Sequence, residues 1–138
     1  MRIFLVFLMS FSLLFGEIEE SKSSYTDYEE LHDYSGLITL GLLGATILTI
    51  PNEELHEKFG MASAIGMGVT STFGFMAHKD EVFDLSEGLK AEHWHTILGT
   101  IATIAIIASV SQAPEHSHAS LGMLGGITAG ASFIIVKW

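Results

Sequence analysis

Four of the seven histidines in this 138-residue chain are each followed, four positions later, by a glycine. The pairs are His32 with Gly36, His56 with Gly60, His95 with Gly99, and His118 with Gly122. Residues four apart lie one turn apart on the same face of a helix, so each pair sets an imidazole beside backbone that carries no side chain. Neutral imidazole is a common metal ligand, and bare backbone leaves room for a flat group beside it. The pattern predicts four helix-borne metal ligands next to space for a wide, planar cofactor.

Histidine must carry any transition-metal chemistry in this chain, because the sequence contains no cysteine. Disulfides, c-type haem attachment, iron–sulfur clusters and thiol catalysis are therefore excluded. The formal net charge of -10 argues against nucleic acid as a partner. No pattern indicates a catalytic base, a nucleophile or a phosphate-binding loop.

The composition is that of a membrane protein: 49% of the residues are hydrophobic, 16% are charged, and the mean hydropathy is +0.44. Four apolar segments are each about long enough to cross a bilayer. They run from Tyr34 to Ile50, Phe59 to Ala77, Trp94 to Ala113, and Ala119 to Val136. Short connections make consecutive helices antiparallel neighbours. The sequence predicts an all-α, integral membrane, up-down four-helix bundle over residues 34–138, with lipid as its surroundings.

The N-terminal part has two predicted regions. Residues 1–16 have the form of a secretory signal peptide, with Arg2 followed by a short apolar run, although an uncleaved anchor is the alternative. Residues 17–33 hold seven acidic residues and one lysine, and we interpret them as an acidic extracytoplasmic leader. The leader is either a solvated segment or a docking site for a basic redox protein. A multi-pass protein of the cell (inner or cytoplasmic) membrane is expected.

The second half of the bundle repeats the first. Residues 56–61 align with residues 118–123, and residues 32–36 align with residues 95–99. The sequence therefore predicts a duplicated helical hairpin.

Helix starts alternate between the two ends of an antiparallel bundle. His32 and His95 therefore share an outer level, and His56 and His118 share an inner level. Two imidazoles from opposite helices, in an apolar core, form an axial ligand set for haem iron. Zinc or copper would favour a compact cluster instead. We expect two b-type haems, one near each membrane face, with His78 as a possible replacement for His32.

The other two histidines, His93 and His116, lie two residues before an expected ligand and so point to a different face. We interpret them as surface residues or as partners of haem propionates.

These residues resemble the cytochrome b-561 superfamily, in which four transmembrane helices hold two b-type haems through paired histidines near opposite membrane faces. The segments that carry the resemblance are His95-Thr-Ile-Leu-Gly99 and His118-Ala-Ser-Leu-Gly122, within residues 32–138. The resemblance implies that His32 and His95 bind one haem and that His56 and His118 bind the other. The sequence predicts fewer helices than the eukaryotic members have, and it shows no basic cluster suited to an ascorbate-like donor.

Three functions are compatible with the sequence. The first is a membrane-bound dihaem cytochrome b that carries electrons between a quinol or cytoplasmic donor and an extracytoplasmic acceptor. It would be an electron-transfer component with quinone or proteins as redox partners, rather than a stand-alone enzyme. The second is a membrane protein that relays copper, zinc or nickel through its histidines. The third is a structural subunit that anchors a larger redox complex.

Overall fold

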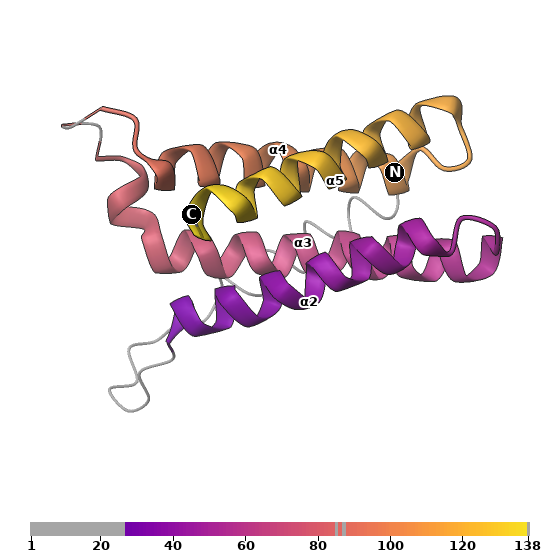
Figure 1. Ribbon diagram of the computed structural model, residues 1–138, viewed down its shortest axis with the longest axis horizontal. Coiled ribbons are helices and arrows are strands. Elements are labelled where there is room, and N and C mark those ends of the chain that lie inside the picture. The colour runs from indigo at the N-terminus through magenta and orange to yellow at the C-terminus, as the bar shows by residue number, and fades with distance from the viewer. Residues whose placement is uncertain (1–26, 85, 87, 138) are drawn as a thin grey trace.

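Four helices make up the computed structural model, which describes residues 27–84, 86 and 88–137 (Figure 1). They are α2 (Tyr28–Leu48), α3 (Glu53–Val82), α4 (Ala91–Ser111) and α5 (His116–Lys137). Each helix contains a stretch long and apolar enough to span a membrane. The all-α prediction with four membrane-length helices is confirmed. The expected signal peptide, residues 1–16, and the first ten residues of the expected leader lie outside the described residues.

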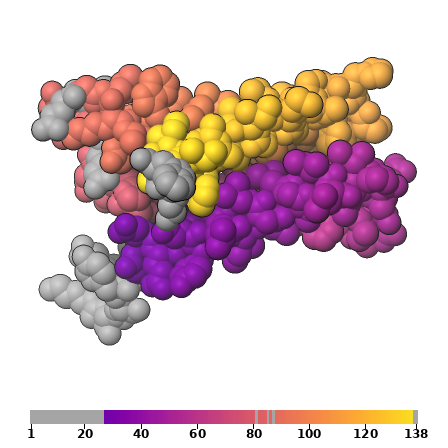
Figure 2. Space-filling view, viewed as in Figure 1, coloured from indigo at the N-terminus to yellow at the C-terminus, as the bar shows by residue number. Residues whose placement is uncertain are grey.

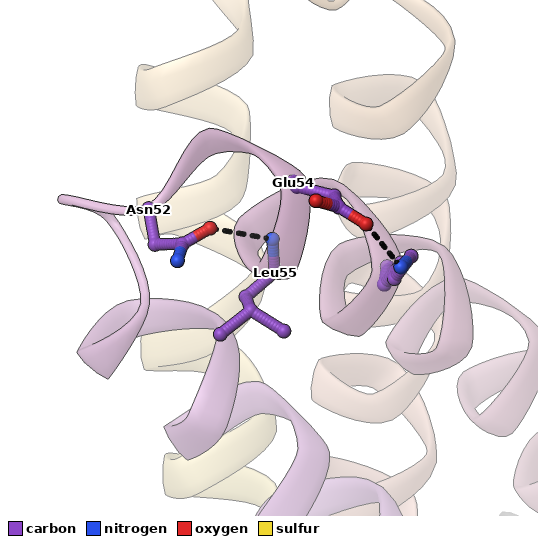
Figure 3. Close-up of polar contacts among 4 residues, drawn as sticks. Asn52, Glu54 and Leu55 are labelled. Atoms are coloured by element: carbon purple, nitrogen blue, oxygen red, sulfur yellow. Dashed lines mark hydrogen bonds and ion pairs between the residues drawn. The ribbon is translucent and has the colours of Figure 1, made fainter.

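Helix boundaries follow the capping residues rather than the ends of the apolar stretches. Helix α2 begins six residues before the expected Tyr34, because the Asp27 carboxylate accepts hydrogen bonds from the backbone N–H groups of Glu29 and Glu30. Helix α3 begins six residues before the expected Phe59. Its first turn is capped by Asn52, whose Oδ1 lies 3.1 Å from the Leu55 nitrogen (Figure 3). The last six residues of the predicted leader are therefore helical, and they include His32.

The helices form two antiparallel hairpins, α2 with α3 and α4 with α5 (Figure 1). The hairpins meet mainly through α3 and α4, whereas α2 and α5 make little contact. Figure 2 shows the seam between α2 and α5 along one face of the molecule. This arrangement puts α2 diagonally opposite α4, and α3 diagonally opposite α5.

The interior combines small and polar residues with a few larger apolar ones (Leu43, Met67 and Ile106), and many large apolar side chains face outward. Two of the most buried side chains are Thr39 and Ser63, and Ala102 is fully buried. By contrast, Leu48 is 83% exposed and Met123 is 68% exposed. Small residues let membrane helices approach closely, and lipid solvates the large apolar residues outside. The distribution fits a multi-pass membrane protein.

Hydroxyl groups also link the helices to one another. Thr46 Oγ1 lies 3.1 Å from Ser63 Oγ within the first hairpin. Ser71 Oγ lies 2.7 Å from Thr103 Oγ1 and joins α3 to α4. Bonds of this kind contribute on average about 0.6 kcal/mol each in a membrane bundle. Every buried polar side-chain atom that the structure describes has a hydrogen-bond partner.

Candidate metal centres

The four histidines followed by glycine meet as two pairs across the diagonals of the bundle. His32 of α2 and His95 of α4 face one another with their Nε2 atoms 3.4 Å apart. His56 of α3 and His118 of α5 do the same, also at 3.4 Å. The two rings are close to perpendicular in each pair, with interplanar angles of 85° and 88°. The structure thus brings together the residues that the sequence paired.

A hydrogen bond at Nδ1 fixes each of these four rings. Every Nδ1 lies 2.8 to 3.0 Å from a backbone carbonyl oxygen of the other helix in its own hairpin. The bonds join His32 to Thr70, His56 to Thr46, His95 to Ser132, and His118 to Ser109. A carbonyl oxygen can only accept, so each Nδ1 carries the proton and each Nε2 keeps its lone pair. The lone pairs of the two members of a pair therefore point toward one another, as metal ligands require.

The two pairs lie at different levels along the bundle. His56 of α3 bonds to the carbonyl of Thr46, which lies 14 residues beyond His32 on α2. The second pair is therefore displaced from the first by about 14 residues along the helix. At 1.5 Å per residue, this separation is about 21 Å. The second hairpin gives the same value, because the carbonyl that binds His118 belongs to Ser109, 14 residues beyond His95.

The predicted glycines lie against the residues whose carbonyls hold the histidines. A Cβ atom on Gly36 would be 3.5 Å from Thr70, and one on Gly99 would be 3.5 Å from Ser132. Gly60 and Gly122 face Thr46 and Ser109 in the same way, at 3.7 and 3.1 Å. The spacing of these glycines in the sequence predicts that they clear space for a flat ring. In the structure a Cβ atom would meet only ordinary van der Waals distances at Gly36, Gly60 and Gly99, and Gly122 is the tight position of the four.

Gly74 is a site residue that the sequence did not reveal. A Cβ atom at this position would lie 2.7 Å from Cε1 and 2.8 Å from Nδ1 of His32, closer than van der Waals contact permits. The absence of a side chain at Gly74 of α3 therefore leaves room for the ring of His32, which lies on the neighbouring helix α2. Its role depends on the register between α2 and α3, and no local spacing marks it among the many glycines of these helices.

A cavity of about 360 Å³ surrounds the His32–His95 pair and is lined by residues of all four helices. Gly36, Gly74 and Gly99 form part of its wall. Its volume falls within the range of about 300–1,000 Å³ that is typical of ligand sites. Glu29, Asp33 and Glu92 also line it, so carboxylates stand at its polar end.

His78 also lines this cavity, at a point where α3 departs from helical geometry (φ -119°, ψ 16°). Its ring centre is 6.2 Å from that of His32, and the planes of the two rings are nearly perpendicular. The ring nitrogen that faces His95 belongs to His32. The structure thus pairs His95 with His32 and sets His78 beside them.

The prediction for His93, one of the two remaining histidines, is wrong. His93 was expected at the surface or beside a propionate, but its side chain is buried, with 6% exposed. Its Nδ1 accepts the backbone N–H of Lys90 at 3.0 Å, and its Nε2 donates to the carbonyl of Asp84 at 3.1 Å. Both ring nitrogens are thus used in joining α4 to the preceding connection. The expectation for His116 is confirmed, since it is exposed.

The donor sets fit a metal that takes two protein ligands. Within the described part of the chain, no group of three or more His, Cys, Asp or Glu residues could hold a metal ion. A structural zinc site needs four ligands and a catalytic one needs three, whereas iron in a porphyrin needs only axial ligands. The facing Nε2 atoms of His32 and His95, and those of His56 and His118, are the two donors that each pair would supply to such a group.

Comparison with known proteins adds no further assignment. No protein family model, no curated protein and no solved structure matches this chain.

Proposed function

We propose that the chain is a membrane-bound b-type dihaem cytochrome that carries electrons across the membrane. The observation that carries the proposal is the geometry of the two histidine pairs. In each pair the Nε2 lone pairs face one another, and each Nδ1–H is held by a backbone carbonyl. Imidazoles held in this tautomer by a hydrogen bond at Nδ1 are preorganised metal ligands.

His32 and His95 would hold one haem, and His56 and His118 would hold the other. Each haem supplies one-electron oxidation and reduction when it is bound. The chain's part is to fix the four imidazoles and to supply their surroundings, which at the His32–His95 pair include small, apolar and acidic side chains. Gly36 and Gly99 line the cavity around the first pair, and Gly122 is the one of the four predicted glycines at which a Cβ atom would be tight, 3.1 Å from Ser109 Oγ.

The bundle itself is proposed to be a duplicated hairpin. Support comes from the hydrogen bonds of the first hairpin, which recur in the second. His32 and Thr70 correspond to His95 and Ser132, and His56 and Thr46 correspond to His118 and Ser109, always 62 or 63 residues later. The sequence repeats thus coincide with repeated contacts.

The electron path is proposed to connect a quinol or cytoplasmic donor to an extracytoplasmic acceptor across the cell membrane. This direction rests on the predicted signal peptide and acidic leader, which would place the start of α2 outside the cytoplasm. The His32–His95 pair would then lie near the outer face and the His56–His118 pair near the inner face.

The test is to purify the protein in mild detergent, with adequate haem supply during expression, and to record oxidised and dithionite-reduced visible spectra with a pyridine haemochrome assay. A sharp reduced α-band with about two non-covalent haems per chain is expected. A colourless protein would overturn the proposal. Metal analysis of the same sample would then separate the two alternatives, because a copper, zinc or nickel relay retains metal and an anchor subunit retains none.

A further inference from the structure

The two members of each histidine pair are held differently at Nδ1. In the first hairpin the acceptor is a threonine carbonyl, and the hydroxyl of that threonine bonds elsewhere. Thr70 Oγ1 lies 3.3 Å from Thr39 Oγ1. Thr46 Oγ1 donates to the carbonyl of Leu42 at 2.9 Å and lies 3.1 Å from Ser63 Oγ.

In the second hairpin a serine contacts the histidine through its hydroxyl as well as its carbonyl. Ser132 Oγ lies 2.9 Å from His95 Nδ1 and donates to the His95 carbonyl oxygen, also at 2.9 Å. Ser109 Oγ lies 3.1 Å from His118 Nδ1 and donates to the His118 carbonyl oxygen at 2.8 Å. Because the single hydroxyl proton goes to the carbonyl, the hydroxyl oxygen meets Nδ1–H as an acceptor. Each of these two Nδ1–H groups is therefore shared between two acceptors.

From these contacts we infer that Ser132 and Ser109 are positioning residues that set the donor strength of His95 and His118 toward the iron. This inference rests on the proposed function. An additional acceptor at Nδ1–H draws the proton away from the ring and makes the opposite nitrogen a stronger donor. A stronger donor stabilises the ferric more than the ferrous ion, so each serine lowers the reduction potential of its haem.

Burial makes the two contacts effective. Ser132 is 4% exposed and Ser109 is 3% exposed, so water does not compete for either hydroxyl. Hydrogen bonds are electrostatically stronger in such surroundings. The bond from each hydroxyl to the histidine backbone also fixes the hydroxyl's orientation, so its lone pair stays directed at the ring.

The experiment is a redox titration of the purified haem-loaded protein in detergent, comparing S132A and S109A with the wild type. The matched controls are T70V and T46V, which remove hydroxyls at the corresponding positions of the first hairpin but keep the carbonyls. We expect S132A to raise one of the two potentials and S109A to raise the other. Removal of a ligand's hydrogen-bond partner typically changes metal affinity about 10-fold or more. A 10-fold change in the ferric-to-ferrous ratio corresponds to a shift of about 59 mV.

Unchanged potentials in both serine variants, or equal shifts in the threonine controls, would overturn the inference. A second readout applies to variants that bind haem poorly and does not depend on haem. Spectra of metal-free protein labelled with ¹⁵N-histidine report the Nδ1–H of each ring. In S132A the His95 Nδ1–H signal should shift while the His32 signal stays in place, and an unmoved His95 signal contradicts the inference. Failure of the wild type to bind haem would instead overturn the proposed function.

Discussion

Replacing one histidine at a time tests whether the two pairs are separate centres. Replacing His95 with Ala removes one Nε2 donor from the first pair, and replacing His118 with Ala removes one from the second. Each variant should lose about half of the haem per chain, and the surviving haem should differ between the two. Pyridine haemochrome assays and reduced spectra measure both effects. H116A is the control, because His116 is exposed and lies outside both pairs.

His78 offers a sharper test of the ligand assignment. The His32 Nε2 atom faces His95, and the His78 ring lies to the side of His32. H78A should therefore retain two haems, whereas H32A should lose one. The reverse result, with haem lost in H78A and kept in H32A, would show that His78 is the partner of His95.

His93 makes a structural contribution that is separate from the metal centres. It accepts the backbone N–H of Lys90 and donates to the carbonyl of Asp84, so H93A leaves two backbone groups without these partners. A loss of stability of about 1–3 kcal/mol is expected, with haem content unchanged. Thermal unfolding in detergent measures the difference from H116A, which should stay within about 0.5 kcal/mol of the wild type. Wild-type stability in H93A would contradict this role.

At the level of the helices, the spacing between α4 and α5 depends on one of two adjacent glycines. A Cβ atom on Gly125 would lie 2.6 Å from side-chain atoms of Ile106 and 3.1 Å from its backbone nitrogen, whereas one on Gly126 would meet nothing within 4 Å. G125A should therefore force the helices apart, at a cost of about 1–3 kcal/mol. G126A should stabilise the helix by up to about 1 kcal/mol. Circular dichroism melts of both variants compare the effects, and equal melting temperatures would refute the close contact.

Local spacing was sufficient to predict the four helices and the pairing of the four histidines. Residues i and i+4 lie on the same face of every α-helix, whatever its surroundings. Antiparallel connections then bring the starts of alternate helices to the same end of the bundle. The carbonyl acceptors and Gly74 could not be found in this way. They depend on how far one helix is shifted along its neighbour, which small residues spread along the whole contact do not reveal. The starts of α2 and α3 are marked by the capping side chains of Asp27 and Asn52, which lie outside the apolar stretches that set the predicted bounds.

At the scale of the whole molecule, two histidine pairs lie at different levels inside one bundle with a largely apolar exterior. They lie about 21 Å apart along helices that are long enough to span a bilayer. A single centre would serve a reaction at one face, whereas two centres at different depths favour transfer from one face to the other. The proposed electron path therefore requires both pairs in the same molecule.

Proteoliposomes test that requirement directly. Vesicles that contain the haem-loaded protein and trapped ferricyanide should consume dithionite added outside, because electrons must cross the bilayer to reach the acceptor. H95A and H118A each leave one pair intact, and each should reduce the rate to that of protein-free vesicles, whereas H116A should keep the wild-type rate. Transfer that persists in either pair variant would mean that one centre is enough. The two levels would then be independent sites rather than steps of one path.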